Sequence, residues 1–168
     1  KLKNNAICVL DYAHTPDALK ICLENLKEQF SGRKITIVVG CGGDRDQYKR
    51  SIIGKIASKY CSKIYLTDDN PRNENPKNIR NAIKKNIKKN KLLEIPNRKK
   101  AIESAVTNLN PNDILIVSGK GHENIQDFGI RKIFFSDKSI ILNSIKTKNK
   151  LLSNNLKINI LKEYKEAK

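Results

Sequence analysis

The 168-residue sequence has few aromatic residues, no Trp, no Met and no long apolar run. Aromatic residues make up 5% and hydrophobic residues 38%, so Ile, Val and Leu must build the core. No run approaches the roughly 18–20 apolar residues that a bilayer span needs, so we predict no membrane-spanning segment. The first residues also lack the charged-then-apolar pattern of an export signal. Without an initiator Met, and with a strand-like run close to its start, the sequence is typical of one domain of a longer protein.

Cysteine is scarce and shows no metal-binding or redox spacing. The four cysteines lie 14, 19 and 20 residues apart, no Cys-x-x-Cys pair occurs, and only two histidines could complete a metal site. This pattern favours reduced, mostly buried thiols in a cytoplasmic protein over a disulfide framework. We predict no metal centre. The residues concerned are Cys8, Cys22, Cys41 and Cys61.

Acidic residues are half as numerous as basic ones, 17 against 34, which gives a formal net charge of +17. A charge of this size suggests nucleic-acid binding. The lysines are nevertheless scattered and are not interleaved with aromatic residues that could stack on bases. We therefore favour a solvated surface that attracts anionic substrates, with no specific nucleic-acid partner. A basic nucleic-acid-binding module remains the alternative from a different functional class.

Short β-branched apolar runs alternate with stretches of helical periodicity. We predict strands at residues 6–10, 34–39, 63–67, 92–95, 113–117 and 132–135. We predict helices at residues 16–30, 50–60, 78–89, 98–109 and 137–145, the last capped by Ser136-Asp137. This order is typical of a Rossmann-like α/β domain, with a mostly parallel sheet of about six strands and helices on both faces. The domain would cover residues 1–145, and residues 146–168 would form a Lys- and Asn-rich tail that is helical or poorly ordered.

Three loops directly follow predicted strands, at residues 40–46, 68–76 and 118–123. In an open α/β sheet ligands bind at the edge where the strands end, so we expect the functional site there. The first loop has three glycines around Cys41, but it matches neither a dinucleotide fingerprint nor a P-loop. These glycines could serve a tight turn alone, or they could let the backbone approach a ligand beside the guanidinium of Arg45.

The other two loops supply an amide, a second guanidinium and a carboxylate. In Asp69-Asn70-Pro71-Arg72 the proline fixes the backbone between two hydrogen-bonding groups, although an Asx-turn with a surface arginine would look similar. Glu123 follows a glycine-rich turn and could hold an ammonium group. Together these groups suit a ligand with carboxylate and ammonium ends, such as an amino acid.

The turn at residues 11–17 adds an aromatic ring and an imidazole, Tyr12 and His14, at the same edge. These side chains could contact a nucleotide base or ribose. The alternative is an ordinary strand-to-helix cap, in which Thr15 or Asp17 satisfies free backbone amides.

Four motifs occur in order between Cys8 and Asp137: Asp-Tyr-Ala-His-Thr-Pro-Asp at 11–17, Gly-Cys-Gly-Gly-Asp-Arg-Asp at 40–46, Thr-Asp-Asp-Asn-Pro-Arg at 67–72 and Gly-Lys-Gly-His-Glu at 119–123. Together they resemble the C-terminal domain of the Mur ligases, above all the members that add meso-diaminopimelate to a peptidoglycan precursor. The resemblance implies the third domain of a cytoplasmic, ATP-dependent amide ligase that acts through an acyl phosphate. The other two domains of such a ligase would bind UDP-N-acetylmuramoyl-L-alanyl-D-glutamate and make most of the contacts to ATP and Mg²⁺. The domain alone should therefore be inactive.

The resemblance implies that one set of residues reads carboxylates. Arg45, Asn70 and Arg72 would bind the carboxylates of meso-diaminopimelate, and Asp69 and Pro71 would complete the same binding loop. Diaminopimelate differs from lysine by one carboxylate, and a bidentate arginine is suited to reading that group. Arg72 would therefore decide between the two amino acids.

A second set implied by the resemblance holds the ammonium group and the nucleotide. The carbonyl of Gly119 and the carboxylate of Glu123 would take the distal ammonium of diaminopimelate, and His14 would lie near the adenine or ribose of ATP. Lys120 and His122 receive no role.

Besides the nucleic-acid module, two alternatives remain open. The first is a sister ligase of the same fold, either a lysine-adding enzyme or a folylpolyglutamate synthetase, and the Asp69–Arg72 loop argues against it. The second is a degenerate remnant without activity, which the four intact motifs disfavour.

Overall fold

The computed structural model describes the backbone of residues 1–166 and the side chains of residues 1–155. At its centre lies a five-stranded sheet in the order β1 (Ile7–Asp11), β5 (Ile114–Ser118), β2 (Ile35–Val39), β3 (Lys63–Leu66) and β4 (Leu92–Glu94). Every neighbouring pair in this sheet is parallel. A separate antiparallel pair consists of β6 (Ile125–Asp127) and β7 (Lys132–Phe134). The helices are α1 (Pro16–Gln29), α2 (Tyr48–Tyr60), α3 (Pro76–Lys84), the 3-10 turn η1 (Lys89–Lys91), α4 (Arg98–Thr107) and α5 (Asp137–Glu166).

Burial and capping explain why these segments take these forms. β2 (Ile-Thr-Ile-Val-Val) and β5 (Ile-Leu-Ile-Val-Ser) are buried along their whole length, as expected of central strands in a parallel sheet covered on both faces. α1 begins at Pro16, and Oγ1 of Thr15 accepts a hydrogen bond from the amide of Ala18 at 3.3 Å. At the start of α5, Oγ of Ser136 accepts from the amide of Ser139 at 3.3 Å, so the predicted cap is present.

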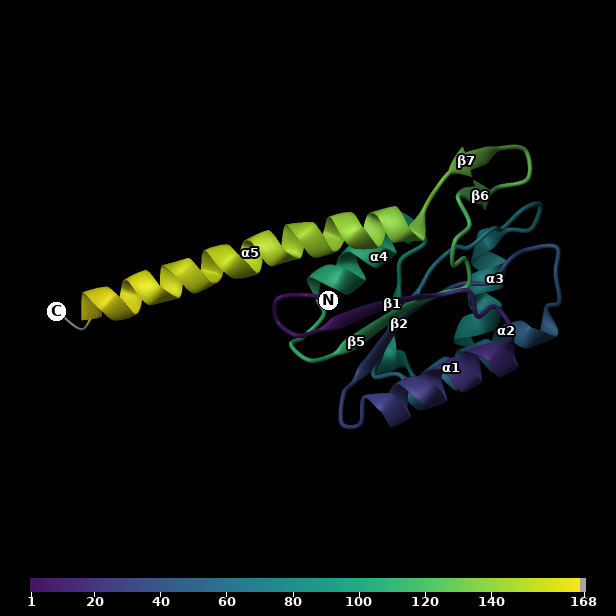
Figure 1. Ribbon diagram of the computed structural model, residues 1–168. Helices are drawn as coiled ribbons and strands as arrows, with labels where there is room; N and C mark the ends of the chain where they lie inside the picture. Colours follow the sequence, from purple (N-terminus) through teal and green to yellow (C-terminus); the bar gives the residue numbers. More distant parts are fainter. Residues whose placement is uncertain (167–168) are drawn as a thin grey trace.

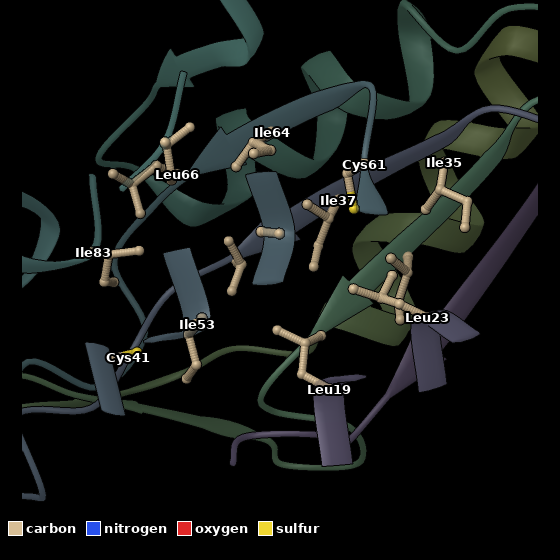
Figure 2. Close-up of a cluster of buried hydrophobic side chains, with 14 of the residues drawn as sticks. Leu19, Leu23, Ile35, Ile37, Cys41, Ile53, Cys61, Ile64, Leu66 and Ile83 are labelled. Atoms are coloured by element: carbon tan, nitrogen blue, oxygen red, sulfur yellow. The ribbon is translucent and has the colours of Figure 1, made fainter. Parts of the chain in front are cut away.

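Helices cover both faces of the sheet (Figure 1). On one face, α1, α2 and α3 enclose a cluster of aliphatic side chains against β2, β3 and β5, which Figure 2 shows in close-up. On the other face, α4 and α5 pack against the alternate residues of the same strands, Val38, Tyr65 and Leu115 among them. Most of the buried hydrophobic residues are Ile, Leu and Val, as the low aromatic content predicts.

The predicted fold class is confirmed, and two details differ. The predicted strand at 132–135 forms as β7, but it pairs with β6 in a hairpin, so the main sheet has five strands and not six. β6 was not predicted because three residues, only one of them apolar, show no recognisable period. α5 continues without a break past residue 145, where we placed the start of a tail, and the division into domain and tail stays a prediction. No helix within residues 1–166 combines the length and apolar character that a bilayer crossing requires.

All four cysteines are free thiols. Burial raises the pKa of Cys8 and Cys22 to about 11 and the pKa of Cys41 and Cys61 to about 12. Thiols with such pKa values stay protonated near neutral pH and are poor nucleophiles and poor metal ligands. All four side chains pack with the aliphatic clusters on the two faces of the sheet.

Candidate functional site

Four loops meet at the carboxyl ends of β1, β5, β2 and β3, which are adjacent in the sheet. A cavity of about 510 Å³ lies between them and is lined by Tyr12, His14, Thr15, Gly42, Arg45, Asp46, Lys49, Asp69, Asn70, Arg72, Gly119 and Glu123. Seven of the eight predicted site residues therefore line one cavity, and the eighth, Pro71, is buried beside them. The structure places these residues together, and their individual binding roles stay predictions.

The loop after β2 and the loop after β3 are in direct contact. The amide of Gly43 donates to the carbonyl of Asn70 at 2.8 Å. A Cβ atom at position 43 would lie 1.9 Å from the carbonyl oxygen of Pro71, so only glycine fits there. Gly43 thus lets two site loops approach each other closely, which neither of our interpretations of the glycine loop predicted.

An ion pair that the sequence did not reveal joins α2 to the loop after β3, between a buried arginine and a partly exposed glutamate. Arg50, near the start of α2, is 2% exposed and donates to both carboxylate oxygens of Glu74, at 2.9 and 2.7 Å. Glu74 also accepts from the amide of Asp44 at 2.6 Å. The hydrogen bonds from Arg50 lower the pKa of Glu74, against a smaller raising effect of burial. No motif marks such a pair, because 24 residues separate its partners.

Two guanidinium groups reach the cavity from different loops. Arg72 has a left-handed backbone (φ 50°), and its Nη1 donates to the carbonyl of Gly43 at 2.7 Å. Its Nε lies 3.9 Å from a carboxylate oxygen of Asp127. Arg45 is exposed and, among the described residues, donates only a long 3.5 Å hydrogen bond to its neighbour Asp44. Arg72 is thus held in place, whereas most of the N–H groups of Arg45 are available to a ligand.

Lys120, to which the sequence assigned no role, has no exposed side-chain surface and lies among residues that line the cavity. Its Nζ donates to Oδ1 of Asn70 at 2.8 Å and to Oε2 of Glu123 at 2.9 Å, and it lies 3.5 Å from Oδ1 of Asp69. Burial acts to raise the pKa of Glu123, but the hydrogen bond and charge of Lys120 outweigh it and leave that pKa below its ordinary value. Glu123 is therefore ionised at neutral pH.

Three rings gather where β1 and β5 end. Tyr12 stacks with His122 at 5.5 Å between ring centroids and meets His14 edge-on at 4.8 Å. Tyr12 and His14 are exposed and line both the main cavity and a more apolar one of about 480 Å³ beside α1. Exposed rings of this kind can stack on a nucleotide base. Lys49, another residue that the motifs did not single out, lines the main cavity and donates to the carbonyl of His14 at 3.0 Å.

The cavity lining contains groups that can bind carboxylates and ammonium groups. Within the residues that the structure describes, no group of three or more His, Cys, Asp or Glu side chains is placed to hold a metal ion. The sequence also contains no Gly-x-x-x-x-Gly-Lys-[Ser/Thr] loop to cradle phosphates. Two guanidinium groups, one lysine, one carboxamide and three carboxylates line the cavity, and these can bind and orient a zwitterionic ligand.

Residues 1–121 match the family model described as "Mur ligase, glutamate ligase domain". The chain is 46% identical over 144 residues to UDP-N-acetylmuramoyl-L-alanyl-D-glutamate--2,6-diaminopimelate ligase of Rickettsia montanensis. The aligned region covers 85% of this chain and 30% of that protein. It is 45% identical over 141 residues to the protein of the same name from Buchnera aphidicola subsp. Schizaphis graminum, with 83% and 28% covered. A solved structure of UDP-N-acetylmuramoyl-L-alanyl-D-glutamate--2,6-diaminopimelate ligase superposes with a TM-score of 0.80 at 36% identity, over 86% of this chain and 30% of that one. The chain thus spans about 30% of the length of the relatives that it matches.

Proposed function

Because this chain belongs to the Mur ligase family, we propose that it is the amino-acid-binding domain of an ATP-dependent ligase that adds meso-diaminopimelate to UDP-N-acetylmuramoyl-L-alanyl-D-glutamate. The observation that carries the proposal is the single cavity that gathers two arginines, an amide and an acid from three loops. Diaminopimelate has two carboxylates and two ammonium groups, so the arginines and the amide are complementary to its carboxylates and the acid to an ammonium group. The relatives' shared name supports the same amino acid.

We assign the carboxylate-binding role to Arg45, Asn70 and Arg72. Arg72 is fixed by its hydrogen bond to Gly43, so its remaining N–H groups keep a set direction toward the cavity. Arg45 is exposed and can close on a ligand after entry. A fixed guanidinium group and an exposed one can together bind one carboxylate, and they disfavour a ligand that lacks it.

Gly119 and Glu123 take the distal ammonium group in this proposal. Glu123 is ionised and uses Oε2 for both of its contacts, with Lys120 and with Asn70. Its Oε1 has no hydrogen-bond partner among the described residues and is left for the ligand. Holding one end of diaminopimelate in this way leaves the amine at its other end free to attack the activated D-glutamate carboxyl group. The domain thus contributes binding and orientation to the reaction.

ATP and Mg²⁺ enter this proposal through the other domains of the whole ligase. The residues described here supply neither a metal site nor a phosphate loop, so we derive no step of ATP chemistry from them. Tyr12 and His14 can contact the adenine or ribose from this side, because their rings are exposed at the cavity edge. A cytoplasmic location is part of the proposal, since four free thiols persist in reducing compartments.

Calorimetric titration of the 168-residue chain with meso-diaminopimelate and with L-lysine tests this function. We expect diaminopimelate to bind, and lysine to bind about 10- to 100-fold more weakly, because the guanidinium groups lose a charge-assisted partner. Equal affinities would favour a lysine-adding sister ligase. Absence of binding by both amino acids would overturn the proposal for this domain.

A further inference from the structure

We propose that Lys120 is a positioning residue that sets the hydrogen-bonding polarity of the amino-acid cavity, so that Asn70 presents a donor and Glu123 presents an acceptor to the ligand. The inference deepens the proposed function and rests on it for the identity of the ligand. Its structural part concerns three side chains whose contacts are independent of which amino acid binds.

The first support is that Lys120 spans two loops that the sheet keeps apart. Lys120 follows β5 and Asn70 follows β3, and β2 lies between these strands. Neighbouring strands lie roughly 4.8 Å apart, so the lysine stem must cover most of about 10 Å. The crossing is possible because glycines directly after β2 and β5 let the backbone segments approach one another closely. A Cβ at Gly40 would lie 2.5 Å from the carbonyl of Thr67, and one at Gly119 would lie 2.8 Å from Oδ2 of Asp69.

The second support is the orientation of the Asn70 amide. Its Oδ1 accepts from Nζ of Lys120 at 2.8 Å and from the amide of Asp127 at 3.0 Å. If the oxygen and nitrogen of this amide were exchanged, Nδ2 would face Nζ of Lys120 and the backbone amide of Asp127. All three groups are donors, so no hydrogen bond could form among them. Nδ2 must therefore face the other way, where it donates to Oε2 of Glu123 at 3.1 Å. One hydrogen of Nδ2 remains, and it can serve a carboxylate.

The third support is the charge balance around Lys120. Asp69 and Glu123 are both acidic, both lie within 3.5 Å of Nζ, and Asp69 has 9% of its side chain exposed. The positive charges of Arg72 and Arg98 also interact with this cluster. Without the ammonium of Lys120, Glu123 would lose the cation that lowers its pKa and would lie near the carboxylate of Asp69 with no ammonium between them. A protonated Glu123 has no negative charge and would hold an ammonium group much more weakly.

Replacing Lys120 by Met keeps most of the stem and removes the charge, so Lys120→Met is the decisive variant. We expect meso-diaminopimelate to bind about 10- to 100-fold more weakly to it in calorimetry at pH 7. We also expect the carboxyl carbon of Glu123, followed by NMR, to titrate at higher pH than in the unaltered chain. A side chain that only stabilised the fold would not move that titration.

Lys148→Met is the matched control, because Lys148 is also a buried lysine (9% exposed) but caps α4 through the carbonyls of Val106 and Thr107, at 3.0 Å each. It should lose stability without any change in the titration of Glu123. If Lys120→Met does not fold, the unaltered chain decides the matter alone, and a midpoint for Glu123 at or above 4.5 overturns the inference.

The outcomes separate this inference from the proposed function. If the unaltered chain does not bind diaminopimelate but Glu123 titrates as expected, the proposed function fails and the positioning role of Lys120 stands. If the chain binds diaminopimelate and Lys120→Met binds it equally well, with Glu123 unchanged, the inference about Lys120 is wrong and the function stands.

Discussion

Arg72 shows how much of the site depends on the backbone state of one residue. A left-handed backbone is uncommon for a residue other than glycine, and Arg72 (φ 50°) and Asp44 (φ 51°) both adopt it in the two loops that touch. At Asp44 the bend lets the carboxylate accept from Nδ2 of Asn73 at 2.8 Å. At Arg72 it turns the guanidinium back toward Gly43. Mutual contacts of the loops therefore hold conformations that would cost free energy in either loop alone.

Arg72→Ala should weaken the binding of meso-diaminopimelate by about 2–4 kcal/mol, or roughly 30- to 1000-fold, because a charge-assisted, bidentate contact is lost. Lysine binding should change little, so the preference between the two amino acids should shrink. Arg72→Lys should not restore it, since an ammonium group cannot make the planar two-point contact. Calorimetry with both amino acids measures the effect. Arg131→Ala, which removes an exposed arginine outside the cavity, is the control and should leave both affinities unchanged.

Glu74 should make stability depend on pH. Its pKa is lowered in the folded state, so its contribution is fully present above its ordinary pKa of 4.5 and is lost as the pH falls through the lower, folded-state value. Glu74→Gln should cost about 1–3 kcal/mol at pH 7, because buried Arg50 loses its charged partner. Urea unfolding at pH 7 and near pH 3 should then show a smaller loss in the variant than in the unaltered chain. The same measurement on Glu28→Gln, an exposed position, should match the unaltered chain.

At the scale of elements, a second buried ion pair fixes α4 and α5 to the sheet. Arg98, the first residue of α4, donates to both carboxylate oxygens of Asp137, the first residue of α5, at 2.9 and 2.7 Å. Neither side chain has exposed surface. Arg98 also donates to the carbonyl of Ser118 at 3.0 Å, at the point where β5 gives way to the loop that carries Lys120. The pair thus anchors the base of one site loop to two helices.

Asp137→Asn should destabilise the fold by about 3–5 kcal/mol, because it leaves the buried charge of Arg98 without its partner. Chemical denaturation monitored by circular dichroism measures the loss. The comparison is Glu103→Gln on α4, whose carboxylate lies 3.9 Å from Lys99 at an exposed surface. That change should cost less than about 0.5 kcal/mol. Similar losses for the two variants would contradict the anchoring role of the Arg98–Asp137 pair.

At the scale of the whole molecule, the net charge of +17 has two consequences. It attracts anionic ligands toward a cavity whose own lining is balanced, with three basic side chains, Arg45, Lys49 and Arg72, beside three acidic ones, Asp46, Asp69 and Glu123. It also invites non-specific contact with nucleic acids. Among the described side chains, the large exposed aromatic residues Tyr12, Tyr48 and Phe134 belong to three separate segments, so no row of aromatic rings runs along the surface to stack successive bases of a strand.

We therefore expect only weak, salt-sensitive binding to nucleic acid. The complex with a generic DNA duplex should be detectable at low salt and disappear by roughly 0.15 M salt, as non-specific phosphate contacts do. Fluorescence anisotropy across a salt series measures this directly. A sequence-selective, submicromolar complex at 0.15 M salt would show that the charge is a binding surface.

Periodicity and local chemistry were enough to determine much of this protein. Central strands such as β2 and β5 are nearly continuous runs of β-branched residues, and helices such as α1 carry their own proline and capping signals. The residues of the site could also be predicted, because loops after parallel strands converge on one edge whatever the details of packing. That convergence brought Arg45, Asn70 and Glu123 to one cavity.

Only the tertiary structure decided how those residues are held and which way they face. Arg50, Arg98 and Lys120 each pair with a residue of another element, Glu74, Asp137 and Asn70, at separations of 24, 39 and 50 residues, and no local pattern encodes such pairs. β6 was likewise beyond prediction, because a three-residue strand exists through its pairing with β7 and not through its own periodicity. Local signals place a side chain at the site, whereas the free energy of burying a charge depends on every element packed around it.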